Sequence, residues 1–351
     1  MDMLLRGEQG YSPWTIWWHR LLRGTPPEGY DLRLTLSLPL QQAAMEALQG
    51  REGAVVILSG ASGEILALAT SPSYDPGQLE EQWQQLISDP TSPLLNRAAQ
   101  ATYQPGTALA PLLFAWGFDR GESASSQTPD LAAPVRIDGQ LLSCAWPISN
   151  RTIDSLESSL RFGCPAPWGG LAQQLGPQSM VEFINAFGLG TTLPVPLDQS
   201  EPWRGTIASD PESLAQFGYG QGGLTLNPLQ LARAFASLAA SDGSLPSVSL
   251  LDASREPGGS WQAIAAGGVV ERAVSAEAAS RTREALTQNE IIEFAADAIA
   301  GDAGQQLGWW MAAGTTGELR PVIVITLEDE SAMSARALGT SLFQHIQTLV
   351  P

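Results

Sequence analysis

Two apolar β-type segments near opposite ends of the chain constrain its fold more than any other feature. Residues 53–70 read GAVVILSGASGEILALAT, in which two apolar runs flank a turn rich in glycine and serine, and this pattern predicts a β-hairpin. Residues 321–329 read PVIVITLED and predict another buried strand. Segments with helical periodicity occupy most of the sequence between them. We therefore expect one α+β domain whose sheet is assembled from both ends of the chain.

Further strands and several helices complete the expected organisation. The strands are expected at 31–38, 298–306 and 308–313, which read DLRLTLSL, AIAGDAGQQ and GWWMAA. Helical patterns and their caps are found at 40–50, 78–87, 152–163, 168–176, 179–190, 275–288 and after the glycine-rich loop that begins near 218. Residues 1–29 are expected to be an extended lead-in that is closed by the turn TPPEG.

The charged residues limit both the partners and the chemistry of the chain. Asp and Glu number 36 against 18 Lys and Arg, so the formal net charge is −18. Such a surface repels nucleic acid and anionic membranes, and no nucleic-acid partner is expected. All 18 basic residues are arginine, so the chain contains no lysine. It therefore has no lysine that could act as a Schiff-base former or a general base.

Histidine and cysteine are too few and too scattered to predict a metal or cofactor site. His19 and His345 lie near opposite ends, outside any metal-ligand spacing, and are expected to be structural or surface residues. Cys144 and Cys164 form no CxxC pattern, so no zinc site is expected. They either form a disulfide, which stabilises by about 3 kcal/mol in an oxidising compartment, or remain two buried free thiols.

The N-terminal sequence lacks the features of a membrane span or a signal peptide. No stretch reaches about 18 uninterrupted apolar residues, and Glu8 comes early with no small-residue cleavage site after it. We expect the chain either to be cytosolic or to follow an anchor that precedes this sequence. Trp14, Trp17 and Trp18 either pack within the protein or contact a membrane interface, and packing is the favoured interpretation.

Several phrases, in this order, resemble the transpeptidase domain of class B penicillin-binding proteins. The similarity runs from about Gly29 to the C-terminus, and its phrases are DLRLTLSLPLQQAAMEAL, GAVVILSGASGEILALATSPSYDP, PLLNRA, YQPGT, FGYGQGGLTLNPLQLARAFASLA and PVIVITLED. The resemblance implies a five-stranded antiparallel sheet covered by helices, as in serine β-lactamases. It implies a transpeptidase-like domain at 30–351, after a pedestal or linker remnant at 1–29, on the extracytoplasmic face of a bacterial membrane.

The first two catalytic motifs of this family have lost their reactive residues in this chain. The family uses SxxK, SxN and KTG motifs, in which a lysine three residues after the serine takes its proton. The first motif falls on YQPGTALAP, so Thr107 stands at the nucleophile position and Ala110 at the lysine position. The second falls on SLRFGCPAPW, with Gly163 in place of the serine and Pro165 in place of the asparagine.

The third motif falls on AGDAGQ and has also lost its lysine. Asp302 replaces the lysine, Ala303 replaces the threonine, and Gly304 is kept. GTTG at 314–317 is rejected as the motif because no strand would follow PVIVITL. A carboxylate at position 302 would repel the carboxylate of a substrate by roughly 1 to 4 kcal/mol at ~4 Å.

Loss of all three motifs predicts a pseudoenzyme that serves as an interaction or scaffold module in peptidoglycan synthesis or cell division. Its expected partners are a membrane glycosyltransferase or other cell-wall and division proteins, with the membrane reached only through an upstream anchor. Two alternatives are a receptor that uses the former cleft for another ligand, and a residual acyl-transfer enzyme with Thr107 or Cys164 as nucleophile. The GYGQGG loop is expected to pack tightly near the cleft, and Arg97 either anchors a loop or is a surface residue.

Overall fold

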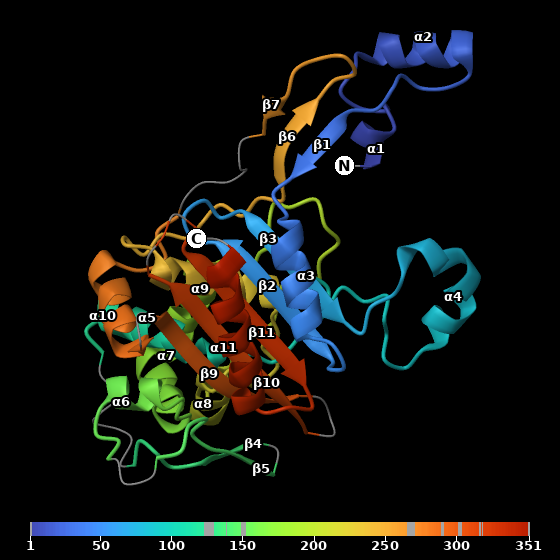
Figure 1. Ribbon diagram of the computed structural model, residues 1–351. Helices are drawn as coiled ribbons and strands as arrows, with labels where there is room; N and C mark the ends of the chain where they lie inside the picture. Colours follow the sequence, from blue (N-terminus) through green and yellow to red (C-terminus); the bar gives the residue numbers. More distant parts are fainter. Residues whose placement is uncertain are drawn as a thin grey trace.

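The centre of the computed structural model is a six-stranded antiparallel sheet in the order β3-β2-β11-β10-β9-β8 (Figure 1). The structure describes residues 2–122, 130–137, 139–148, 152–264, 271–288, 291–300, 304–315, 317 and 319–349. The strands are β2 (Gly53–Ser59), β3 (Ile65–Ser71), β8 (Thr287–Gln288), β9 (Ile291–Ala300), β10 (Gln305–Gly314) and β11 (Pro321–Glu328). Because β2 pairs with β11, the sheet joins the two ends of the chain, as the apolar patterns predict.

The sheet has one more strand than the five that the resemblance implies. The additional strand is β8, in which Thr287 pairs with Ile292 and Gln288 with Ile291 at the edge of the sheet. It arises because Thr287 and Gln288, directly after helix α10 (Ala276–Leu286), are extended and pair with the first residues of β9. The five longer strands form the sheet that the family resemblance implies.

The segment 298–306, expected to be one strand, belongs to two strands. Its first residues end β9 and its last residues begin β10, and the two strands pair from Gln305↔Ala300 to Gly314↔Ile291. Gly304 has a φ of 66°, in the left-handed region that favours glycine, and it closes the turn between them.

The segment 31–38 forms a strand outside the main sheet. β1 (Asp31–Leu34) pairs with β6 (Leu251–Arg255), which pairs in turn with β7 (Gln262–Ala263). The ion pair between Asp31 and Arg255, at 2.5 Å, lies across the β1–β6 ladder. β1 is short because Leu38 already begins helix α3 (Leu38–Ala47).

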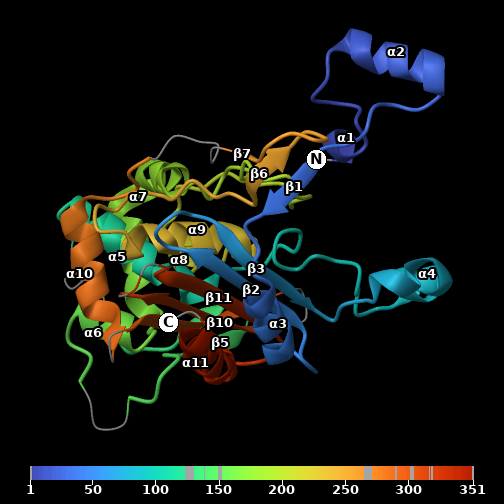
Figure 2. The ribbon, with the colours of Figure 1, turned by 45° about the horizontal axis from the view of Figure 1, so that its top comes forward.

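Residues 1–29 contain helices, in contrast to the extended lead-in that the sequence predicts. The helices are α1 (Asp2–Leu5) and α2 (Pro13–Arg23). Ser12 accepts a hydrogen bond from the Thr15 amide at 3.1 Å, Pro13 occupies the first turn, and Gly24 caps the end with a φ of 71°. Figures 1 and 2 show α1, α2, β1, β6 and β7 as an arm that projects from the body of the molecule.

The two faces of the main sheet are covered by different helices. α3 and α11 (Ala332–Leu349) pack on one face, and α9 (Pro228–Ala239) and α5 (Ala110–Asp119) lie behind the other (Figure 1). Alternate side chains along the strands enter the two cores, so that Val56 and Trp309 face one and Val55 and Trp310 face the other.

The remaining elements are the helices α4 (Leu79–Ser88), α6 (Leu156–Arg161), α7 (Ala166–Ala186) and α8 (Pro211–Gly218), the 3₁₀ turns η1 (Pro76–Gln78) and η2 (Gly106–Leu109), and the hairpin β4 (Val135–Ile137) and β5 (Gln140–Leu142). Of these elements, α6, α7 and α8 contribute to the core that contains Val56 and Trp309, whereas α4 projects from the body of the molecule (Figure 1). α7 joins two expected helices end to end across a kink at Gly176 and Pro177. Among the described residues, no helix is long and apolar enough to cross a bilayer.

Candidate functional site

The turn that carries Thr107 is enclosed by glycine-dependent contacts on two sides. Thr107 lies in η2 and only 1% of its surface is exposed. A Cβ at the preceding Gly106 would lie 2.5 Å from the Cβ of Ala298 on β9, and a Cβ at Gly220 would lie 1.9 Å from the Gly106 carbonyl oxygen. The Gly106 amide donates to the Gly220 carbonyl at 3.0 Å. The GYGQGG loop therefore packs closely here, as expected, and holds the Thr107 turn against β9.

The position of the family's lysine is an apolar core position in this chain. Ala110 begins α5 and is fully buried, and its amide donates to the Thr107 carbonyl. Residues three apart on a helical turn lie on the same face, so the methyl group of Ala110 lies on the face of Thr107, at the position that the family's lysine occupies. A methyl group cannot accept a proton, and the chain contains no lysine.

The second predicted site is a buried turn between α6 and α7. Gly163 has a φ of 61°, and a Cβ there would lie 2.8 Å from the Ala295 carbonyl oxygen of β9. Cys164 is fully buried and forms a disulfide with Cys144, and its carbonyl accepts from the Trp168 indole at 2.6 Å. Pro165 is the N-cap of α7 and has no amide hydrogen to donate.

The chain segment 144–146 fills the space beside this turn. Ala145 donates its amide to the Gly163 carbonyl at 3.2 Å, and its Cβ lies 2.9 Å from the place where a Gly163 Cβ would stand. Trp146 donates its amide to the Phe162 carbonyl at 3.2 Å, and the Arg336 guanidinium lies 4.2 Å from the centre of its ring. The main chain of residues 144–146 therefore packs directly against the second-motif turn.

The outer edge of β9 is occupied beside the Thr107 turn as well. The buried side-chain amide of Gln221, oriented so that both of its polar atoms are satisfied, donates to the Ile299 carbonyl at 3.0 Å and accepts from the Ile299 amide at 3.1 Å. Further along, Gln140 donates to the Gly304 carbonyl at 2.6 Å. The Gln221 contacts use main-chain groups of β9 with which an added peptide strand would pair.

The strand residues beside Thr107 precede the predicted third motif. Gly304 lies in the turn after β9, and Asp302 and Ala303 lie outside the described residues. The residues of β9 that meet the η2 turn are Asp297 and Ala298. Sequence reasoning missed them because no pattern in the sequence marks the point at which β9 passes that turn.

Asp297 is the acidic residue of β9 closest to the site, yet its carboxylate lies on the other face of the sheet. It accepts hydrogen bonds from the Ala332 amide at the start of α11, at 2.6 Å, and from Gln306 at 3.0 Å. Burial raises the pKa of this carboxyl, and the two hydrogen bonds oppose that rise. Its role in the structure is to cap α11.

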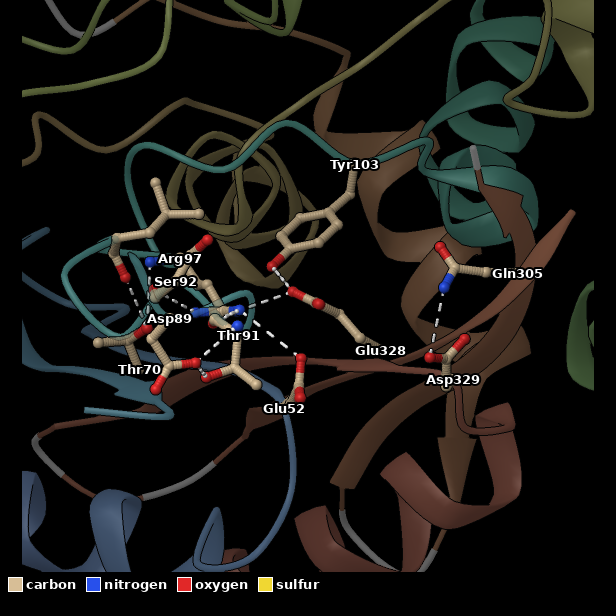
Figure 3. A network of polar contacts seen from close by, with 11 residues as sticks. Glu52, Thr70, Asp89, Thr91, Ser92, Arg97, Tyr103, Gln305, Glu328 and Asp329 are labelled. Carbon is tan, nitrogen blue, oxygen red and sulfur yellow. Dashed lines mark hydrogen bonds and ion pairs between the residues drawn. The ribbon is translucent and has the colours of Figure 1, made fainter. Parts of the chain in front are cut away.

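Arg97 and Tyr103 meet at one carboxylate and anchor the chain before the Thr107 turn (Figure 3). The Nε of Arg97, a buried residue, donates to Glu328 Oε1 at 2.8 Å, and its terminal nitrogens donate to the carbonyls of Thr91 and Ser92. Tyr103 donates to the same Glu328 oxygen at 2.6 Å. Of the two interpretations of Arg97, the structure shows the anchoring one.

Comparison with known proteins gives one family for most of the chain. Residues 53–324 match the model of the penicillin binding protein transpeptidase domain. The peptidoglycan D,D-transpeptidase PbpA of Mycolicibacterium smegmatis is 29% identical over 79% of this chain and 60% of its own length. The peptidoglycan D,D-transpeptidase MrdA of Acinetobacter baumannii is 30% identical over 66% of this chain and 38% of its own length. The chain therefore spans only part of the relatives that it matches.

The fold is shared with solved structures. Penicillin-binding protein A from M. tuberculosis, as its penicillin G acyl-enzyme complex, superimposes with a TM-score of 0.80 and 24% identity over 98% of this chain and 86% of that one. The transpeptidase domain of a peptidoglycan glycosyltransferase from Eggerthella lenta gives a TM-score of 0.76 and 21% identity over 92% of this chain and 85% of that one. At these identities the likeness concerns the fold.

Proposed function

This chain belongs to the penicillin-binding protein transpeptidase domain family, and we propose that it is a member without acyl-transfer activity that serves as an interaction module in peptidoglycan synthesis or cell division. The observation that carries the proposal is the pairing of a 1% exposed Thr107 with a fully buried Ala110 at the lysine position. The names of the relatives apply to proteins longer than this chain.

The first support is chemical. A hydroxyl becomes an effective nucleophile when a neighbouring base takes its proton, and that assistance contributes about 10²- to 10⁴-fold in rate. Ala110 offers no base, and the second-motif turn supplies Gly163 and Pro165, which carry neither a hydroxyl nor an amide side chain. Three separate losses remove the base, the proton relay and the cation together.

The second support is access. An acyl donor must bring its carbonyl carbon to about 3–3.5 Å from the attacking oxygen. Thr107 is only 1% exposed, the preceding Gly106 is packed against β9 and the Gly220 loop, and the neighbouring edge of β9 is paired with Gln221. A donor would have to displace these contacts before it reached the hydroxyl.

The third support is that the contacts that build the fold around the first motif are present, although its catalytic residues are absent. The Arg97–Tyr103–Glu328 contacts retain the framework around the lost nucleophile, which is what a binding module requires of its scaffold. The inferred partners are a membrane glycosyltransferase or another cell-wall or division protein. The inferred location is the extracytoplasmic face of the membrane, where an oxidising environment maintains the Cys144–Cys164 disulfide.

Labelling with a fluorescent penicillin tests the proposal. Purified protein is incubated with the reagent and analysed by gel and intact mass, beside penicillin-binding protein A from M. tuberculosis, which forms a penicillin G acyl-enzyme, as positive control. We expect no covalent adduct. An adduct that disappears in Thr107→Ala, but persists in the matched variant Thr282→Ala at another buried threonine, would establish a residual acyl-transfer enzyme instead.

A second measurement separates an interaction module from a receptor that uses the former cleft. Affinity purification from membranes of the native organism is expected to enrich a cell-wall glycosyltransferase or division protein. A receptor would instead show a rise in melting temperature with a muropeptide or a β-lactam, without covalent change and without a protein partner.

A further inference from the structure

Helix α2 exposes a wide apolar face that no part of the described chain covers. Five of its six large apolar side chains are between 46% and 67% exposed, and α2 has no buried residue. They are Trp14, Trp17, Trp18, Leu21 and Leu22. Their spacing of three and four residues places them on one side of the helix. The expectation that the tryptophan cluster packs within the protein is therefore wrong.

The opposite face of α2 is polar apart from the partly buried Ile16, and it is fixed to the arm. Thr15, His19, Arg20 and Arg23 lie on it by helical spacing. Arg20 forms an ion pair with Glu8 at 2.8 Å, which holds this face toward the α1–α2 loop. The indole rings stack on one another, with 4.9 Å between the ring centres of Trp14 and Trp17. The apolar face is thus ordered and directed away from the arm.

The place of α2 in the molecule leaves this face accessible to an extended surface. Figures 1 and 2, which differ by a 45° rotation, both show α2 at the end of the arm, beyond β1, β6 and β7 and far from the main sheet. A planar surface can therefore meet α2 without first meeting the body of the domain.

The charge distribution distinguishes the arm from the rest of the chain. Residues 1–30 contain three acidic residues (Asp2, Glu8, Glu28) and three basic ones (Arg6, Arg20, Arg23), so their net charge is zero and residues 31–351 carry the whole −18. Within α2 there are two arginines and no carboxylate. Anionic lipid headgroups therefore repel the body but attract the polar face of this helix.

We propose that α2 is an interfacial membrane-binding helix, whose tryptophan and leucine face enters the boundary between headgroups and acyl chains of an anionic bilayer. Its 11 residues extend about 16 Å, too short for a hydrocarbon core of about 30 Å, so it lies parallel to the surface. Tryptophan is the side chain most typical of this boundary, and a basic polar face opposite Trp and Leu is typical of such helices. This contact is additional to any anchor upstream and is independent of the proposed function.

Vesicle flotation tests the proposal on the whole chain. The protein is mixed with vesicles of phosphatidylcholine containing phosphatidylglycerol, and insertion is followed by quenching of tryptophan fluorescence with brominated lipids. The test variant is Trp17→Ser with Leu21→Ser. The matched control is Trp83→Ser on the projecting helix α4, where the tryptophan is 47% exposed, against 49% for Trp17. Circular dichroism verifies that each variant is folded.

We expect the partition coefficient of the test variant to fall about tenfold or more, with Trp83→Ser unchanged. Vesicles of phosphatidylcholine alone should bind the unmodified chain several-fold more weakly, as should Arg23→Gln with anionic vesicles. Equal binding of the test variant and the unmodified chain would overturn the proposal. So would a dimer, seen by light scattering without lipid, that Trp17→Ser dissociates, because the face would then bind a second copy.

Discussion

Tyr103 donates its phenolic hydrogen to the carboxylate of Glu328 at 2.6 Å, across 225 positions of sequence. The bond joins the residue that opens the YQPGT phrase to the end of the last strand of the sheet. Tyr103 also packs edge-on against Trp309, with 5.9 Å between the ring centres. These contacts explain why the phrase around a lost nucleophile is retained: its aromatic residue holds the sheet to the helical side of the domain.

Replacing Tyr103 by Phe should lower the free energy of unfolding by about 1–3 kcal/mol, because a buried hydrogen bond to a charged group is removed. Urea denaturation followed by circular dichroism measures the change. Tyr74→Phe is the matched control, since Tyr74 is outside this network, and it should change stability by less than about 0.5 kcal/mol. An equal effect of the two substitutions would contradict the structural role given to Tyr103.

The same hydroxyl predicts a loss of stability in alkali. Burial, and then the negative charge of Glu328, raise the pKa of Tyr103 in the folded chain. Because the folded pKa lies above the unfolded value, its contribution is fully present below about pH 10 and is lost as the pH rises further. Denaturation midpoints measured between pH 8 and 11 should therefore fall less steeply in Tyr103→Phe than in the unmodified chain.

Gly106→Ala should destabilise the domain by about 2–4 kcal/mol, the sum of a left-handed backbone strain and an overpacked contact. Gly106 has a φ of 53°, and its added Cβ would lie 2.5 Å from Ala298. Gly121→Ala isolates the first contribution, because Gly121 has a φ of 68° and open space around it. Thermal unfolding measures the loss of stability in both variants. Equal losses of stability in Gly106→Ala and Gly121→Ala would show that the Thr107 turn is not held against β9.

Removal of the disulfide should cost about 3 kcal/mol of stability, since it closes a loop of about 20 residues in the unfolded chain. The measurement compares urea denaturation of the oxidised chain, the reduced chain and the Cys144→Ala, Cys164→Ala variant. Reductant should destabilise the unmodified chain and leave the variant unaffected. A variant as stable as the oxidised chain would indicate that the segment 144–146 is held by packing alone.

Much of the fold follows from local patterns. The apolar runs at 53–70 and 321–329 predict the central strands. The helix expected at 152–163 begins later, at Leu156, because Ser155 forms a reciprocal capping box with Ser158. Local patterns do not specify the structure of residues 31–38 and 1–29, because the conformation of a short segment depends on the surface against which it packs. β1 pairs with β6 and not with a strand of the main sheet, and this pairing depends on the tertiary structure.

Residue order and identity alone establish the family, the central sheet built from both chain ends and the absence of any lysine. The burial of Thr107, the position of segment 144–146 beside the second-motif turn and the exposed apolar face of α2 became visible only in the folded chain. Chemistry depends on which side chains exist, whereas access and exposure depend on which distant segments pack against them, and no local pattern specifies that packing.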